Sequence, residues 1–470
     1  MKVILLRRTT RATLAACLCV AGSACASKPV EVTSTAIVTL DTTRRPAAKL
    51  RKPAPARNFW GAMTNLDPDY VTTYPASPDE REFAGALRLI MSGDADEAEL
   101  SLDSLARHST DSIVRSASHI LLTAALQYQN KWKELAEIAP PRRLDMDPAD
   151  IDRAGVELWA AAFKNVPSRQ VSFPLEAVVV PLTLSATGTP VIPVQVNGKL
   201  KQLWLDTGSS MSIVASDVAA ECGVEPLVSD TLEVATSTGR VTARPAALHR
   251  LDIGGISISS STAMIVASRL MEVRVGDLQN PSRTAKIDGI VGFDIISQLN
   301  IQVDFAKNLV TLTKPVRAAP NQAPQRNFFW VGTPIVRLVS QRGVPVYLGL
   351  DTGAQETFAS ERLLEKVRVR TFVGERKRVG GFAGLREFRG RFISDLRLAL
   401  GGKTLLFEKL LVFVPAVSTF VNLDGVLGSD IGRAGVMRID AVNGVFTVEA
   451  SPFERRSGSS PILRSAAATR

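Results

Sequence analysis

Cysteine and histidine are scarce in this 470-residue chain, which contains 4 Cys and 3 His. Three of the cysteines fall within the first 25 residues, so Cys222 is the single cysteine of the rest of the chain. One cysteine cannot form an internal disulfide, and three scattered histidines do not supply the ligands of a zinc site. We therefore expect no metal centre, and we expect Cys222, which lies in a run of small residues, to be a buried thiol.

Long apolar runs are also missing. After residue 30, no stretch reaches the roughly 20 apolar residues that span a bilayer. The formal net charge of +10 is concentrated near the N-terminus, because residues 1–25 carry +4 and residues 26–57 carry +5, which leaves +1 for residues 58–470. A nearly neutral body does not offer a basic face, so no nucleic-acid partner is expected. The composition, with 45% hydrophobic and 22% charged residues, is typical of a globular protein of two or three domains.

Residues 1–25 have the features of a bacterial export signal. A basic start (MKVILLRRTTR) precedes an apolar stretch that is too short to cross a membrane. The sequence GSAC, ending at Cys25, resembles a lipobox, whereas Ala24-Cys25-Ala26 fits ordinary signal-peptidase cleavage. We expect lipidation at Cys25, with simple secretion as the alternative, and hence a periplasmic or membrane-anchored bacterial protein. Residues 26–57, rich in Pro, Lys and Arg, are expected to form an extended tether.

Residues 58–165 are predicted to form a small α-helical module. Between residues 78 and 165, apolar residues recur at i, i+3 and i+4, with breaks at Gly93, His108 and Pro140. The pattern on either side of Gly93 resembles one tetratricopeptide-type (TPR-like) helix hairpin. We expect a short α-helical module that either caps the rest of the chain or docks another protein.

From about residue 172 the pattern becomes one of short β-branched runs separated by Gly, Asn and Ser turns, which predicts strands. Residues 287–312 match residues 423–448 without a gap at an offset of 136, and Asp294 recurs as Asp430. LWLDTGSS (203–210) matches LGLDTGAQ (348–355) at an offset of 145. A duplicated β lobe explains both matches. The predicted segments are a first lobe at 172–316, a linker at 317–326, a second lobe at 327–452 and a flexible tail at 453–470.

Each lobe has an aliphatic strand ending in Asp-Thr-Gly, at 206–208 and 351–353, and a later element of two aliphatic residues and Gly, at 290–292 and 426–428. This double pattern resembles the aspartic peptidases. The arrangement in one chain is that of the pepsin-like enzymes, and the short lobes are closer to the retropepsin-like families. The resemblance, over roughly residues 172–452, implies a mainly β fold. Two homologous β-barrel lobes would be related by a pseudo-twofold axis and preceded by the helical module.

The resemblance also implies that Asp206 and Asp351 form the catalytic pair. Hydrolysis by this route needs one carboxyl to activate a water while the other protonates or hydrogen-bonds the carbonyl of the cleaved bond. Two adjacent carboxylates resist ionising together, so a state with one shared proton exists.

Neighbouring residues are expected to support this pair. Ser209 is expected to donate to Asp206, a bond for which the second lobe has no counterpart because Ala354 stands there. As in the family, the hydroxyls of Thr207 and Thr352 would bond across the lobe interface. Glycines would let the backbone turn and bring N–H donors to the carboxylates, and would let the second element pack under each loop. These are Gly208 and Gly353 in the loops, and Gly292 and Gly428 beneath them.

The pepsin-like enzymes carry a tyrosine on a flap, and neither candidate flap here, at 234–246 or 378–390, contains one. The second candidate, with Gly380, Gly381 and an apolar tip at Phe382, is more similar to the glycine-rich flaps of retropepsins. Residues 361–391 carry ten Lys or Arg against four Glu. Such a segment is commonly a solvated face, and the alternative is that an acidic partner, an acidic substrate or a membrane surface approaches it.

These features predict an exported bacterial aspartic endopeptidase that acts on a peptide or protein substrate, with no cofactor. The catalytic unit is expected to be a monomer of two lobes. Two alternatives stay open: a non-catalytic envelope protein that binds peptides in the same cleft, and a protein in which each lobe pairs with a lobe of another chain.

Overall fold

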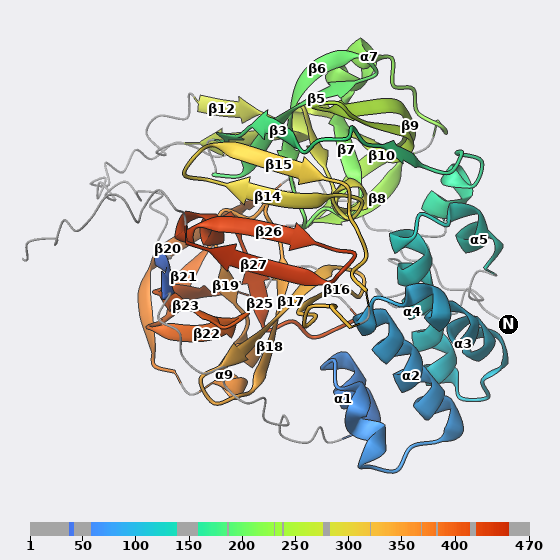
Figure 1. The fold of residues 1–470 in the computed structure, drawn as a ribbon, viewed down its shortest axis with the longest axis vertical. Helices are drawn as coiled ribbons and strands as arrows, with labels where there is room; N and C mark the ends of the chain where they lie inside the picture. Colours follow the sequence, from blue (N-terminus) through green and yellow to red (C-terminus); the bar gives the residue numbers. More distant parts are fainter. Residues whose placement is uncertain are drawn as a thin grey trace, which may run out of the picture.

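The fold is that of a computed structural model of the full chain, with a helical module beside two β lobes (Figure 1). Among the described residues, no helix is long and apolar enough to cross a membrane. Cys25 and the predicted export signal lie outside the described residues, as does the predicted tail. The structure describes residues 37–41, 58–138, 158–185, 188–229, 231–236, 239–275, 283–319, 321–367, 369–381, 384–413 and 420–450.

Local sequence signals mark the two ends of one long helix in the helical module. Ser77 and Glu80 form a capping box that starts a helix at Pro78, and Gly93 ends it with a φ of 84°, a conformation that favours glycine. The break at Pro140 lies outside the described residues. The helical elements are α1 (Phe59–Thr64), η1 (Pro68–Thr72), α2 (Pro78–Ser92), α3 (Ala95–His108), α4 (Ser112–Tyr128) and α5 (Trp132–Glu137).

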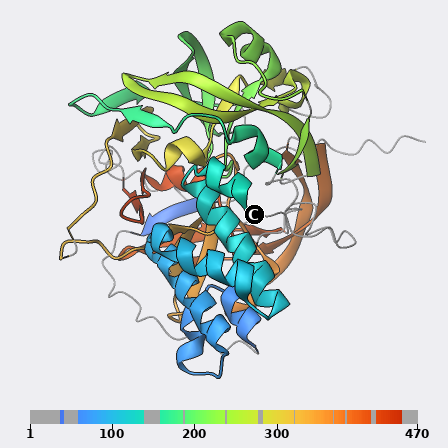
Figure 2. The same ribbon diagram turned by 90° about the vertical axis from the view of Figure 1, so that its right-hand side faces the viewer.

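Consecutive helices of the module pack side by side, with α3 against both α2 and α4. Their shared core includes Phe83, Leu87, Leu102 and Leu121, which are fully buried. The module runs along both β lobes (Figure 2). Residues 158–163 form a further helical stretch, which leads into the first lobe.

Lobe 1 is built on a nine-stranded sheet in the order β2-β10-β7-β13-β6-β5-β9-β8, with β4 beside β5. Its strands are β2 (Gln170–Ser172), β4 (Thr183–Leu184), β5 (Pro190–Val196), β6 (Lys199–Leu205), β7 (Ser212–Ala215), β8 (Leu232–Thr236), β9 (Gly239–Ile253), β10 (Ile256–Val266) and β13 (Gly289–Val291). The lobe also contains the pair β11 (Glu272–Val275) and β12 (Arg283–Lys286), and the short helices α7 (Ser216–Cys222), η2 (Ser268–Leu270) and α8 (Phe293–Ile296).

Lobe 2 is built on an eleven-stranded sheet in the order β1-β23-β22-β17-β18-β25-β19-β24-β21-β20, with β16 beside β17. Its strands are β1 (Ile37–Asp41), β16 (Phe328–Trp330), β17 (Pro334–Ser340), β18 (Pro345–Leu350), β19 (Phe358–Ala359), β20 (Thr371–Gly381), β21 (Gly384–Ile393), β22 (Leu396–Leu400), β23 (Lys403–Glu408), β24 (Leu410–Val412) and β25 (Gly425–Leu427). Two short helices, α9 (Glu361–Lys366) and η3 (Ser429–Ala434), complete it.

The strand pairings show the duplication directly. In lobe 1, β13 runs parallel to β6 and antiparallel to β7, and β7 runs parallel to β10. In lobe 2, β25 runs parallel to β18 and antiparallel to β19, and β19 runs parallel to β24. Each lobe therefore repeats one four-strand arrangement around its Asp-Thr-Gly loop.

A separate sheet joins the lobes, in the order β27-β26-β14-β15-β3. At its centre β14 pairs with β26, the strand that repeats it in sequence, and Asn300 faces Asp440 while Asp304 faces Val436. Because Asn300 corresponds to Val436 and Asp304 to Asp440 in the repeat, this register is twofold symmetric. The strands are β3 (Val178–Pro181), β14 (Asn300–Asp304), β15 (Leu309–Thr313), β26 (Val436–Asp440) and β27 (Val445–Glu449).

One segment of the predicted tether is ordered instead. Residues 37–41 form β1, which pairs with β23 along the edge of the lobe 2 sheet, and Val38 is buried there. The prediction of an extended tether over 26–57 is therefore wrong for these five residues. The run IVTLD is apolar enough to bury part of one face against lobe 2, although its neighbours are basic and rich in proline.

Candidate active site

Both Asp-Thr-Gly loops follow a strand that is buried where it enters the loop. Asp206 follows β6, and Asp351 follows β18, in which all six residues are buried. The N–H of Asp206 donates to the carbonyl of Val291 at 3.1 Å, and that of Asp351 donates to the carbonyl of Leu427 at 2.9 Å. The predicted aliphatic-Gly elements, as β13 and β25, thus hold the start of each loop.

The two loops are bonded across the lobe interface by their threonines, as the resemblance implies. The N–H of Thr207 donates to Thr352 Oγ1 and the N–H of Thr352 donates to Thr207 Oγ1, each at 3.0 Å. The hydroxyl of Thr207 donates to the carbonyl of Leu350 at 2.9 Å, and that of Thr352 donates to the carbonyl of Leu205 at 2.6 Å. These four reciprocal bonds hold the loops in one fixed, symmetric position.

The loop glycines are required by close approach. A Cβ on Gly208 would overlap the carboxyl of Asp351, and one on Gly353 would overlap the carboxyl of Asp206. The turn in the backbone is not the reason, since neither residue has a positive φ. Each carboxyl therefore lies directly against the loop of the other lobe.

The two carboxyls lie within hydrogen-bonding reach of each other. Asp206 Oδ1 accepts the N–H of Gly208 at 2.8 Å, and Asp351 Oδ1 accepts the N–H of Ala354 at 2.9 Å. Burial raises the pKa of Asp206 well above its usual range, and the adjacent Asp351 carboxylate raises it further. Burial also raises the pKa of Asp351, against an opposing contribution from its hydrogen bonds, including the one with Asp206. The arrangement therefore favours a state in which the two carboxyls share one proton.

The predicted role of the Ser209 side chain is wrong. Its hydroxyl donates to the carbonyl of Met211 at 2.7 Å, and it is the backbone N–H of Ser209 that bonds Asp206. The backbone N–H of Ala354 bonds Asp351 in the same way. Since backbone groups do this in both lobes, the missing hydroxyl at Ala354 does not distinguish the two carboxyls.

Gly292 and Gly428 pack beneath the loops as predicted. A Cβ on Gly292 would overlap the backbone of Met211, and one on Gly428 would overlap the backbone of Glu356. Each N–H is held by a hydroxyl, Ser212 Oγ at 3.1 Å in lobe 1 and Thr357 Oγ1 at 3.0 Å in lobe 2.

Two buried acids complete this support. Asp294 Oδ1 accepts the Ser212 hydroxyl at 2.9 Å, and Asp430 Oδ1 accepts the Thr357 hydroxyl at 2.6 Å. Sequence reasoning gave these acids no role, although the recurrence of Asp294 as Asp430 in the repeat was the signal that marked them.

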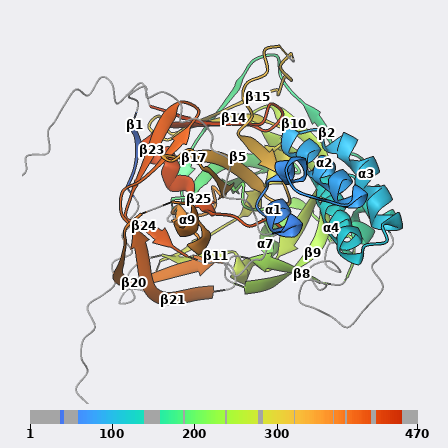
Figure 3. The ribbon, with the colours of Figure 1, turned by 90° about the horizontal axis from the view of Figure 1, so that it is seen from below.

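Both candidate flaps are hairpins. In β20–β21, Gly380 faces Leu385 and Gly381 faces Gly384, so the two glycines lie at the tip of the hairpin. The predicted apolar tip residue, Phe382, lies outside the described residues. In β8–β9, Thr236 faces Gly239. The two hairpins lie on the same side of the molecule, seen from below in Figure 3.

Metal-ligating residues do not gather elsewhere in the part of the chain that the structure describes, where no group of three His, Cys, Asp or Glu could hold an ion. Cys222 is 5% exposed, which confirms the predicted buried thiol. Trp204 is likewise buried, in β6.

Part of the chain matches a known protein family. A family model described as aspartyl protease matches residues 192–295, which run from β5 to α8 of lobe 1. Among proteins with curated descriptions, none matches the sequence. A retropepsin-like aspartic protease from Rickettsia conorii is 18% identical, with 31% of this chain and 91% of that chain covered and a TM-score of 0.20. An aspartic proteinase from Irpex lacteus is 14% identical, with 59% of this chain and 98% of that chain covered and a TM-score of 0.36.

At such TM-scores these two structures carry no argument of their own. The chain has the bilobal β fold of the aspartic peptidases because of its own repeated strand pairings, its twofold central sheet and its twin Asp-Thr-Gly loops.

Proposed function

We propose that this protein is an aspartic endopeptidase that hydrolyses peptide bonds with a water held between Asp206 and Asp351. One observation supports this above all others: two carboxyls from symmetry-related loops lie within hydrogen-bonding reach and both have a raised pKa. A structural ion pair would join opposite charges, whereas two adjacent acids destabilise the fold when both ionise. A site that retains them in both repeats suits proton transfer.

The two acids would take different roles in the reaction. The ionised member of the pair would accept a proton from the water as the water oxygen attacks the carbonyl carbon, while the protonated member donates its proton to the carbonyl oxygen. The tetrahedral diol then collapses and the C–N bond breaks. The carboxyl that took the proton from the water gives it to the leaving nitrogen, and one diol hydroxyl returns a proton to the other carboxyl, so that a carboxyl and an amine are released. The protons balance within the pair and the substrate, so the step needs no cofactor.

The hairpins β8–β9 and β20–β21 are proposed to close over a bound peptide. One comes from each lobe, and both lie on one side of the molecule (Figure 3). Closure would exclude water other than the attacking molecule.

The test is the loss of cleavage in Asp206→Asn and in Asp351→Asn. Each removes one member of the pair with little change of volume, so we expect turnover of a peptide library to fall at least about a thousandfold, or roughly 4 kcal/mol in activation free energy. Asp103→Asn serves as the matched control, because Asp103 is exposed on α3 and bonds only Arg107 among the contacts described.

Cleavage that persists in either site variant would exclude the mechanism. Peptide binding without cleavage in the wild type would favour the alternative, a non-catalytic envelope protein that binds peptides in the same cleft.

The location and anchoring of the protein are further proposals that rest on the sequence. The basic and apolar start supports export, and Cys25 supports lipid attachment at the bacterial membrane. The TPR-like pattern around Gly93 supports a role of the module in docking another protein.

A further inference from the structure

The helical module contacts both lobes. On the lobe 2 side, the N–H of Asn422 donates to the carbonyl of Thr64 at 2.7 Å, and the rings of Phe83 and Phe420 lie 6.1 Å apart. On the lobe 1 side, Asn130, at the turn after α4, accepts the hydroxyl of Thr262 at 3.4 Å. The module therefore bridges the two halves of the catalytic body.

The side chain of Arg169 bonds both the module, at Asn130, and lobe 1, at Asp294. Its side chain is 6% exposed, its Nη2 lies 3.1 Å from Asp294 Oδ2, and the same nitrogen donates to Asn130 Oδ1 at 3.2 Å. Burial raises the pKa of Asp294, and the Arg169 guanidinium opposes this rise. Such a pair holds its geometry tightly, because removal of either partner leaves an uncompensated buried charge.

Asp294 connects Arg169 to the catalytic loop through hydrogen bonds. Its other oxygen accepts the Ser212 hydroxyl, and Ser212 Oγ in turn accepts the N–H of Gly292. The N–H of Phe293 donates to the carbonyl of Ser209 at 2.7 Å, three residues after Asp206. A continuous series of bonds thus runs from Asn130 of the module to the loop that holds Asp206.

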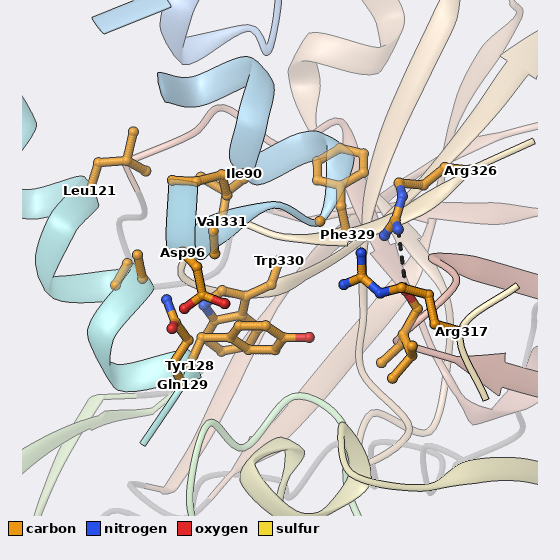
Figure 4. A pocket seen from close by; sticks show the side chains of 16 residues that line it. Ile90, Asp96, Leu121, Tyr128, Gln129, Arg317, Arg326, Phe329, Trp330 and Val331 are labelled. Carbon is orange, nitrogen blue, oxygen red and sulfur yellow. Dashed lines mark hydrogen bonds between the residues drawn. The ribbon is translucent and has the colours of Figure 1, made fainter. Parts of the chain in front are cut away.

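Three stacked aromatic rings form a second connection between the module and lobe 1. Tyr128, the last residue of α4, stacks on Trp330 of lobe 2 with centroids 5.5 Å apart, and Trp330 stacks on Phe293 of lobe 1 at 5.1 Å. Tyr128 and Trp330 overlap in Figure 4, where they line a cavity of about 180 Å³ between the module and lobe 2. The end of α4 is thereby packed against the same helix, α8, that carries Asp294.

We propose that Arg169 is a positioning residue, through which the helical module sets the Asp206 loop in its catalytic geometry. This inference rests on the proposed peptidase function. It implies that the module is a permanent part of the active enzyme, because a site without it would lose the outer end of the Asn130–Arg169–Asp294 series.

Two asparagines of the module allow a matched test. Asn130 has a φ of 60°, so Asn130→Gly removes its side chain without straining the backbone. Asn65→Gly is the control, because Asn65 also follows a helix of the module, yet its side chain accepts from Arg362 and Asn422 of lobe 2. Arg169→Lys is the third variant: it keeps the charge and loses the fork that reaches two partners.

In the full chain, we expect Asn130→Gly to lower kcat roughly tenfold with KM within about twofold, and Arg169→Lys to lower it further. Hydrogen exchange of residues 203–212 should become faster in both variants. Asn65→Gly should leave kcat and this exchange unchanged. Thermal melting of all three variants verifies that they remain folded.

Equal effects of Asn130→Gly and Asn65→Gly, or no effect of Asn130→Gly and Arg169→Lys on either measurement, would overturn the proposal. The exchange measurement does not need catalysis. If the wild type cleaves no peptide, the peptidase proposal fails, and exchange at 203–212 still decides whether Arg169 positions the loop.

Discussion

The hydroxyl of Thr207 both donates and accepts at the centre of the molecule. It donates to the carbonyl of Leu350 and accepts the N–H of Thr352, and Thr207 is fully buried. Thr207→Val keeps the shape and leaves both partners in the other lobe unsatisfied. Each such loss costs about 1–3 kcal/mol, so we expect the two losses together to lower the free energy of unfolding, measured in urea, by about 2–6 kcal/mol.

Thr447→Val is the internal control for this measurement. The hydroxyl of Thr447 is buried and has no hydrogen-bond partner among the described residues, so replacing it with a methyl group should be neutral or stabilising. Equal losses in the two variants would show that the cross-lobe bonds contribute nothing specific.

The raised pKa of Asp206 makes a prediction about stability and pH. A carboxyl whose pKa is higher in the folded than in the unfolded state binds more protons when folded, so its contribution is present at low pH and is lost as pH rises through the folded pKa. Asp206→Asn removes this loss. We therefore expect the variant to melt at about the wild-type temperature near pH 4 and at a higher temperature than the wild type at pH 8. Each 1 kcal/mol gained in the free energy of unfolding should raise the melting temperature by roughly 2–4 °C.

Thermal melts of both proteins across pH 4–8, at constant ionic strength, provide the measurement. A melting difference that stays constant or shrinks with rising pH would mean that Asp206 is not protonated preferentially in the folded state.

Residue-level prediction from the sequence succeeds where a motif repeats and fails where a contact depends on tertiary distance. Asp206 and Asp351 are visible because the same tripeptide ends a strand in each repeat. The partner of the Ser209 hydroxyl is not predictable in this way, because local spacing does not show that this hydroxyl donates to the carbonyl of Met211. Arg169 gave no sequence signal, since its partner Asp294 is 125 residues away.

At the scale of elements, β1 provides a test of an unexpected pairing. Val38 is buried against lobe 2, whereas its neighbour Thr39 is exposed. Val38→Asp would bury a charge without a partner, so we expect it to detach β1 and lower the free energy of unfolding by about 2–3 kcal/mol, the value of a lost buried side chain.

Thr39→Asp places the same charge in the same strand on the exposed side, and we expect a change within about 0.5 kcal/mol. Limited proteolysis of residues 37–41 would report detachment directly. Equal protection of the strand in both variants would contradict the observed register with β23.

Helices and strands are easier to predict from sequence when they are long and when capping or turn residues mark their ends. The start of α2 follows from Ser77, Pro78 and Glu80, and its end follows from Gly93. β1 has five residues in a basic, proline-rich context, and its partner β23 begins more than 360 residues later. No local sequence pattern predicts such a long-range pairing. Composition, the signal that remains, predicts a tether for these residues.

At the scale of the whole molecule, the two lobes related by the twofold axis are repeats within one chain. The offsets of the repeats predict two equivalent lobes, and the β14–β26 pairing shows where they meet. The sequence does not indicate how the module lies on both lobes. That placement depends on side-chain contacts such as Tyr128 with Trp330, which have no repeat and no motif.

Both carboxyls of the site come from one chain, and an experiment that mixes two variants tests this. Asp206 and Asp351 of the same chain lie within hydrogen-bonding reach, and the four threonine bonds between the loops are all intramolecular. Co-expression of Asp206→Asn with Asp351→Asn should therefore restore no cleavage, because every molecule keeps one defective carboxyl. If each lobe instead paired with a lobe of another chain, mixed dimers would contain one intact pair, and a substantial fraction of wild-type turnover would return. The measurement is the cleavage rate of the co-purified variants, with light scattering on the same sample to establish whether dimers are present.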